Sequence, residues 1–181
     1  VQHITYPTPA DIDTYYTDLT GKLMLPEKLP YGNYEITEQC TAYGYVLNTE
    51  PVAFKIDGSK TVVTVEKRNM PQKGIIRIQK NGEVFASVNK SDGVYQPVFA
   101  NKGLAGAVYE ITAAEDIITP DGTLRYAKGT AADTVTTDKK GNAASKPLYL
   151  GKYTVREIKA PYGTVLNGTP ETVELTYAGE T

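Results

Sequence analysis

Two glutamates, Glu38 and Glu157, stand where a charged side chain is unusual. Glu157 follows Tyr153 and Val155 in phase along an alternating run, and Glu38 ends a similar run at 34–38. Because alternate residues of a strand share one face, both glutamates are predicted to point inward with their tyrosines. Ionisable side chains are seldom buried, and a carboxyl group held in a core can move protons to and from a neighbouring group. These two residues are therefore the first candidates for chemistry.

Other residue types that carry chemistry are scarce. His3 is the only histidine and Cys40 the only cysteine, which argues against a Ser-His-Asp triad, a His-rich metal site and an internal disulfide. Asp11, Asp13 and Asp18 lack the loop glycine and the terminal glutamate of an EF-hand. Glycine-rich phosphate motifs are absent. We expect no cofactor, no metal ion and no turnover of a substrate.

The composition indicates an all-β chain. The 181 residues include 14 Tyr against 3 Phe and no Trp, with Gly and Pro scattered evenly, as strand formers with turns between them would be. The formal net charge of −2 argues against a nucleic-acid partner. No apolar run is long enough to span a membrane. The length suffices for one ordinary domain or two small ones.

Short alternating segments between turn signals predict a β-sandwich. Strands are expected at residues 34–38, 61–65, 75–78, 153–157 and 172–176. Turns are expected at 57–58, 81–82, 92–93, 121–122, 140–142 and 161–163. A single helical turn is possible at 113–116, and the long segment 81–103 interrupts the strand pattern.

An internal repeat organises the chain. Gly-x-Tyr with a glutamate four residues after the tyrosine occurs at 32–38 and again at 151–157, an offset of 119, and further matches follow downstream. Upstream the offset is 120. We predict two copies of one module, residues 1–71 and 74–181, joined by a short linker with Pro and Gly. The first copy is expected to lack its opening strands and the second its last strand.

The repeated block carries a family resemblance. Residues 150–163, Leu-Gly-Lys-Tyr-Thr-Val-Arg-Glu-Ile-Lys-Ala-Pro-Tyr-Gly, resemble the most diagnostic segment of Cna protein B-type domains, also called SpaA-like pilin domains. Residues 74–80 and 104–111 resemble their first two strands, and 62–74 the closing strand of the preceding module. The resemblance implies tandem immunoglobulin-like (prealbumin-like) β-sandwich modules, both partial here.

Modules of this family crosslink themselves. A first-strand Lys and a last-strand Asn lie side by side in the core, next to a buried Glu. Burial disfavours charge, so the family's Lys becomes a neutral amine and its Glu a neutral acid. The amine attacks the Asn amide while the acid polarises its carbonyl, and ammonia leaves. The product is one isopeptide bond per module.

The resemblance assigns these roles to residues of this chain. In the second copy Lys80 matches the nucleophile and Glu157 the assisting acid. In the first copy Glu38 matches the acid and Asn69 the electrophile. No residue of the chain matches the second copy's Asn or the first copy's Lys, so neither bond is expected to form within this chain by the family's route. A further hypothesis is that the strand ending at Asn69 docks as the last strand of another chain's second copy.

The predicted function is mechanical. We expect a stalk or shaft segment of a Gram-positive cell-surface adhesin or pilin, secreted and anchored to the cell wall, with neighbouring modules of its parent protein as partners. The alternative is an adhesive module that recognises a host protein or glycan. An exposed apolar or aromatic patch would favour that alternative, and residues 81–103 are its expected place, although they could equally form a hairpin extension. A transthyretin-like hydrolase is disfavoured by the lone histidine.

Overall fold

The computed structural model describes residues 14–179 and confirms the all-β class. No helix occurs among these residues, and most of the strands are short, as expected from Thr, Val and Tyr alternating between turns. His3, Asp11 and Asp13 lie outside the described residues. The chain divides into two units, which comprise residues 14–36 with 51–66 and residues 37–50 with 67–179 of the described part.

The first unit is built on one antiparallel pair. Strand β1 (Gly32–Ile36) pairs with β3 (Val52–Ile56). The ring of Tyr34 stacks on Phe54, 5.6 Å between centroids. The strand expected at 61–65 is not formed, because a strand needs a neighbour for its backbone hydrogen bonds and this segment has no ladder partner in the described part of the unit.

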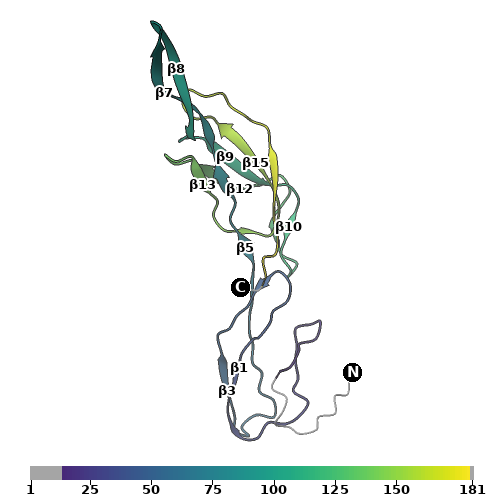
Figure 1. Ribbon diagram of the computed structural model, residues 1–181. Helices are drawn as coiled ribbons and strands as arrows, with labels where there is room; N and C mark the ends of the chain where they lie inside the picture. The colour runs from purple at the N-terminus through teal and green to yellow at the C-terminus, as the bar shows by residue number, and fades with distance from the viewer. Residues whose placement is uncertain (1–13, 180–181) are drawn as a thin grey trace. The chain divides into compact units, whose positions relative to one another are not determined.

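The second unit contains a sandwich (Figure 1). One layer is a four-stranded antiparallel sheet in the order β12 (Ala131–Thr136), β9 (Val108–Ala113), β15 (Gly151–Lys159) and β16 (Glu171–Leu175). The other layer is made of two strand pairs, β5 (Lys73–Gly74) with β14 (Leu148–Tyr149) and β6 (Arg77–Gln79) with β13 (Asn142–Ala144). Three further pairs complete the unit: β2 (Tyr45–Val46) with β4 (Met70–Pro71), β10 (Ile117–Ile118) with β11 (Leu124–Tyr126), and β7 (Asn81–Ser91) with β8 (Val94–Gly103).

The core of the sandwich lies between the two layers. Ile111 of β9 and Tyr153 of β15 are fully buried and meet Ile76 and Leu148 from the opposite layer. Side chains of β15 alternate, so that Tyr153, Val155 and Glu157 all point inward. The period of two seen in the sequence therefore predicted the inward face of this strand correctly.

The internal repeat reappears as repeated geometry. β1 pairs with β3 in the register Gly32↔Ile56, and β15 pairs with β16 in the register Gly151↔Leu175, which is the same register at the offset of 119. The tyrosines at the repeat positions also make the same bond. The Tyr34 hydroxyl donates to the Pro30 carbonyl at 2.8 Å, and the Tyr153 hydroxyl donates to the Tyr149 carbonyl at 2.7 Å.

Asp138 forms the turn between β12 and β13. Its Oδ1 accepts the backbone N–H groups of Lys140 and Asn142, and Asp18 makes the equivalent turn in the first unit with Thr20 and Lys22. Asp18 is thus a turn-forming residue, as its expected loop position allows. Hydrogen bonds from the Asn142 and Lys140 backbone lower the pKa of Asp138 below its usual 3.8.

This lowered pKa gives a pH-dependence prediction. A carboxyl group whose pKa is depressed by folding stabilises the fold above its unfolded pKa, and that contribution disappears as the pH falls through the folded value. We expect Asp138→Asn to reduce the loss of stability as the pH falls below about 4, since the amide oxygen still accepts both N–H groups but does not titrate. Urea midpoints of parent and variant across this range measure the effect. An unchanged acid sensitivity in the variant would contradict it.

Two local expectations are wrong. Asn81 and Gly82 do not form a turn but lie inside β7, because the reversal occurs at Asp92 and Gly93, whose φ values of 50° and 81° suit a tight two-residue hairpin turn. Residues 113–116 form no helical turn, since β9 continues to Ala113 and a bend follows. The interruption at 81–103 is the hairpin extension that the sequence left open.

Candidate functional site

The backbone of Lys80 is fixed between β6 and β7. Its N–H donates to the Gly141 carbonyl at 2.7 Å, and its own carbonyl accepts the Leu104 N–H at 2.9 Å. Gly141 has φ +80°, and a Cβ there would stand 2.2 Å from the Lys80 carbonyl oxygen. Only glycine satisfies both conditions, so the turn at 140–142 can approach the Lys80 backbone closely enough to hold it.

Strand β15 places Glu157 beside Lys80. Its side chain is 1% exposed and lies opposite Tyr109 of β9 in the antiparallel register. Directly after it the register shifts by one residue between Glu157 and Lys159, which leaves Ile158 without a partner in β9. A β-bulge of this kind redirects the chain beside a site and ends the inward alternation at the glutamate.

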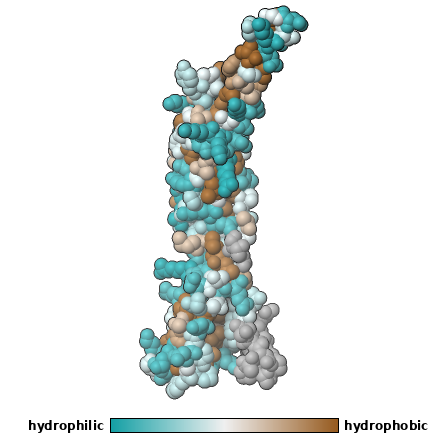
Figure 2. Space-filling model, turned by 60° about the vertical axis from the view of Figure 1, so that its left-hand side comes forward, coloured by the Kyte–Doolittle hydropathy of each residue, from teal (hydrophilic) through white to brown (hydrophobic). Residues whose placement is uncertain are grey.

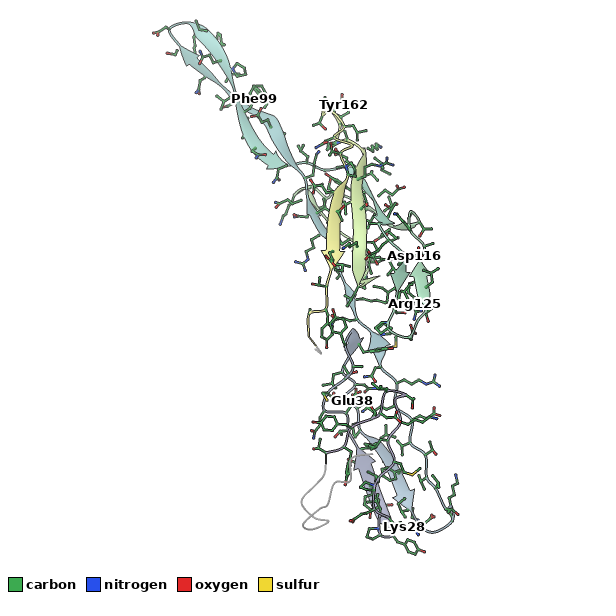
Figure 3. All side chains as sticks on the ribbon, turned by 90° about the vertical axis from the view of Figure 1, so that its right-hand side faces the viewer. Lys28, Glu38, Phe99, Asp116, Arg125 and Tyr162 are labelled. Atoms are coloured by element: carbon green, nitrogen blue, oxygen red, sulfur yellow. The ribbon has the colours of Figure 1, made fainter. Side chains whose placement is uncertain are left out.

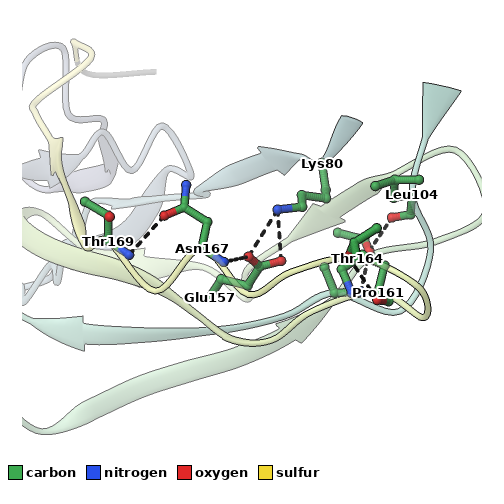
Figure 4. Close-up of polar contacts among 9 residues, drawn as sticks. Lys80, Leu104, Glu157, Pro161, Thr164, Asn167 and Thr169 are labelled. Atoms are coloured by element: carbon green, nitrogen blue, oxygen red, sulfur yellow. Dashed lines mark hydrogen bonds and ion pairs between the residues drawn. The ribbon is translucent and has the colours of Figure 1, made fainter. Parts of the chain in front are cut away.

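Lys80 and Glu157 form a nearly buried ion pair (Figure 4). Lys80 Nζ lies 3.0 Å from Glu157 Oε1 and donates a hydrogen bond to Oε2 at 3.1 Å. The Asn167 backbone N–H donates to the same Oε2 at 2.9 Å. Oε1 is buried and has no hydrogen bond of its own, only the close approach of the lysine. The carboxylate therefore retains one acceptor position for another group.

Tyr109 borders the pair and was not singled out from the sequence. Burial raises the pKa of its hydroxyl, the Lys80 charge lowers it, and the Glu157 charge raises it. These opposing charges place the Tyr109 side chain within the electrostatic reach of both partners. Its position opposite Glu157 could have been found only from the strand register.

Glu38 has a matching environment in the first copy. Asn69 Nδ2 donates to Glu38 Oε2 at 2.6 Å, and the Asn48 backbone N–H donates to the same oxygen at 2.9 Å. Glu38 lies beyond the end of β1 and is only half-buried, so its expected inward position is less complete than that of Glu157 (Figure 3). Asn69 directly precedes β4, the short strand at the end of the segment expected to close the first copy.

Asn48 and Asn167 are site residues whose roles were not deduced from the sequence. Each lies ten positions after its glutamate, and each side-chain Oδ1 accepts the N–H two residues on, from Glu50 at 3.1 Å and from Thr169 at 3.3 Å. These turns aim the backbone N–H of each asparagine at the carboxylate. The signal was present, since Val-Leu-Asn recurs at 46–48 and 165–167.

The structure brings the four predicted residues together in two pairs, Lys80 with Glu157 and Glu38 with Asn69. Cys40 is exposed and lies outside any strand. Residues 14–179 contain no group of three or more His, Cys, Asp or Glu that could hold a metal ion. Within the same range no helix has the length and apolar character needed to cross a membrane.

The family model for the SpaA prealbumin-like fold domain matches residues 3–71 and 98–181. The chain belongs to this family. The match confirms the predicted resemblance to SpaA-like pilin domains and the prealbumin-like fold. Two stretches of one chain match the same SpaA model, and residues 72–97, which include Lys80 and all of β7, lie outside both.

Solved structures also resemble this SpaA-family chain. The Bacillus anthracis TIE protein is 27% identical, with a TM-score of 0.55 over 91% of this chain and 26% of its own. A streptococcal ancillary pilin is 22% identical, with a TM-score of 0.35 over 81% of this chain and 39% of its own. The chain thus spans about a quarter of the length of the TIE protein. No curated protein matches it.

Proposed function

We propose that this chain is a load-bearing segment of a bacterial surface stalk whose modules are closed by Lys–Asn isopeptide bonds. Lys80 is the nucleophile and Glu157 the assisting acid of one module, and Glu38 is the acid and Asn69 the electrophile of the other. The observation that carries this proposal is the equivalence of Glu38 and Glu157, which lie 119 residues apart. Each accepts the backbone N–H of the asparagine ten residues later at 2.9 Å. One glutamate contacts a reactive asparagine and the other a reactive lysine.

Shifting the first copy by 119 residues combines the two pairs into one triad. Glu157 already holds the lysine, and the place of Asn69 beside Glu38 becomes a place for an asparagine amide beside Glu157. The unbonded Glu157 Oε1 is an acceptor that such an amide would satisfy. In each copy the backbone N–H of Asn48 or Asn167 already holds the carboxylate in place before any bond forms.

The reaction follows from these positions. The Lys80 ammonium passes a proton to Glu157, 3.0 Å away, which leaves a neutral amine and a neutral acid. The amine attacks the asparagine side-chain carbon while the acid donates a hydrogen bond to its carbonyl oxygen. The carbon–nitrogen bond to the amide NH₂ then breaks, and ammonia leaves with the proton from the amine. The bond forms once, so the site does not turn over.

A variant with an added strand tests this chemistry. A copy of residues 63–70 is placed directly after Thr181, which sets its asparagine 119 positions from Asn69. We expect the intact mass under denaturing conditions to fall short of the sequence by one ammonia. The chain without the added segment should keep its full mass, because Asn167, the asparagine whose backbone meets Glu157, turns its own side chain to Thr169.

Matched variants separate the chemistry from strand docking. Lys80→Met and Glu157→Gln in the extended chain should each restore the full mass, while Lys152→Met, on the same strand as Glu157, should leave the loss of ammonia unchanged. An extended chain that keeps its full mass while its added strand is protected from hydrogen exchange would refute the assigned nucleophile and acid.

The mechanical role follows from the chemistry and the family. A covalent bond between the first and last strands of a sandwich keeps joined the strands that tension would separate first. The proposed setting is a Gram-positive cell surface, with tandem modules of residues 1–71 and 74–181 and with neighbouring modules of the parent protein as partners. No enzymatic activity is assigned.

An adhesive role is the second candidate. The observation that favours it is a set of exposed aromatic side chains on the hairpin of β7 and β8, in the segment expected to bear such a site.

A further inference from the structure

The hairpin of β7 and β8 forms a two-stranded sheet of its own (Figure 1). It begins directly after Lys80 and pairs from Asn81↔Gly103 to Ser91↔Val94, with a register shift between Phe85 and Ser87 that leaves Ala86 without a partner. A free two-stranded hairpin is at best marginally stable in water. A hairpin of this length, mostly outside the family match, is therefore expected to gain stability from an additional surface.

One face of the hairpin is aromatic. The register places Phe85 opposite Phe99, with ring centroids 6.5 Å apart, and Lys90 opposite Tyr95, with its ammonium 5.1 Å from the ring. Val88 and Pro97 face each other between these pairs. Phe85 is 60%, Phe99 56% and Tyr95 66% exposed. Figure 2 shows apolar surface along this projecting part, and Figure 3 marks Phe99 on it.

The opposite face has a different character. Its cross-strand pairs toward the turn are Ser87 with Val98, Asn89 with Gln96, and Ser91 with Val94. Nearer the base Val84 is partly buried, unlike Phe85 next to it. Contiguous aromatic exposure is thus confined to the face that bears Phe85 and Phe99, which is the kind of surface that marks an interaction site.

We propose that this aromatic face packs against the same face of a second copy of the chain, with the two hairpins antiparallel. We choose a second copy as the partner because the charges on this face are complementary to those of the same face turned around. Along β7 this face carries Glu83 near the base and Lys90 near the turn, with Phe85 and Val88 between them, because their partners in β8 alternate onto one face across the register shift. A two-fold axis midway along this run sets Glu83 of each copy against Lys90 of the other. The same axis brings Phe85 against Val88 and Phe99 against Pro97.

Edge-to-edge pairing through β8 fits the hairpin less well. Pro97 in β8 has no N–H to donate to an added strand, and proline in an edge strand is a common block to such pairing. Face-to-face packing needs no backbone donors and buries the aromatic rings instead. One hairpin face is smaller than the ~800 Å² per partner of standard interfaces, so the dimer is expected to be weak, with a Kd at or above about 1 µM.

Charge reversal on the full chain tests the arrangement by sedimentation velocity between about 1 µM and about 1 mM. Glu83→Lys and Lys90→Glu should each weaken association about tenfold or more, because each creates two like-charge pairs per dimer. The double variant, which exchanges the two charges, should regain the parent affinity. Phe85→Ser should abolish the dimer.

Control variants carry the same charge changes elsewhere on the hairpin. Lys102→Glu, opposite Gly82 on the other face, and Asp92→Lys in the turn should leave the affinity unchanged. A monomer throughout the concentration range would overturn the proposal and leave the aromatic face to a different protein or a glycan. A dimer that survives Phe85→Ser, or that the double charge exchange does not restore, would overturn it as well.

Discussion

Replacing Glu157 by glutamine is expected to lower the free energy of unfolding of the sandwich by about 2–4 kcal/mol, because removing one partner of a buried pair leaves the other charge uncompensated. The glutamate side chain is 1% exposed and that of Lys80 is 18% exposed, so water can solvate the ammonium only weakly when its partner is removed. Glutamine still offers an oxygen to the Asn167 N–H, so the loss reports on the charge.

Companion variants identify the origin of this loss. Lys80→Met combined with Glu157→Gln should be more stable than Glu157→Gln alone, since the double variant contains no unpaired charge. Glu110→Gln is the matched control. Its carboxylate lies 3.8 Å from Arg156 in a partly exposed pair, and ion pairs open to solvent contribute about 0–1 kcal/mol.

Hydrogen exchange of the β15 amides localises the measurement to the sandwich, where whole-chain unfolding would mix two units. A loss for Glu157→Gln no larger than that for Glu110→Gln would contradict the prediction. A loss that small would show that water already solvates the Lys80 ammonium in the folded protein.

Tyr153→Ala is expected to destabilise the sandwich by about 3–5 kcal/mol, the usual cost of deleting a large buried ring. Tyr153 is fully buried among Ile111, Val155 and Leu148, and no backbone shift in one strand can fill the space of the ring. Tyr153→Phe should cost only about 1 kcal/mol, the net value of the hydrogen bond to the Tyr149 carbonyl.

The repeat supplies a control for this effect. Tyr34 occupies the equivalent position and makes the equivalent bond, but it is only half-buried and stacks on Phe54. Tyr34→Ala should therefore cost less than Tyr153→Ala, about 1–3 kcal/mol. Chemical denaturation followed by exchange at β1 and β15 measures both variants. Equal losses would mean that burial of the ring does not set the cost.

Alternation and the repeat predicted much of the fold and of the site. The period of two placed Tyr153, Val155 and Glu157 on one inward face, and the offset of 119 identified Glu38 and Glu157 as equivalent positions of the repeat. Such local patterns are reliable where one face of a strand is fully buried. The chemical roles of Lys80, Glu157, Glu38 and Asn69 stay predictions.

What the sequence could not predict depends on distant neighbours. Residues 61–65 have the composition of a strand, but a ladder requires a partner that composition does not reveal. The Asn-Gly pair at 81–82 signals a turn, yet the pairing of β7 with β8 continues through it. Tyr109 belongs to the site because of its register opposite Glu157, and Gly141 because of its contact with the Lys80 backbone.

The identical register of β1–β3 and β15–β16 has a consequence for folding kinetics. Because all four strands accept the same pairing, β1 can also close on β16 with every backbone bond in place. The loop in that exchanged pair spans 37–170 instead of 37–51, which costs only ~2 kcal/mol more in closure entropy. Backbone bonding and loop length therefore discriminate weakly between native and strand-exchanged chains. Discrimination falls to side chains that differ between the copies, such as Phe54 where the second copy has Val173, so divergence of the repeats itself protects the chain from misfolding.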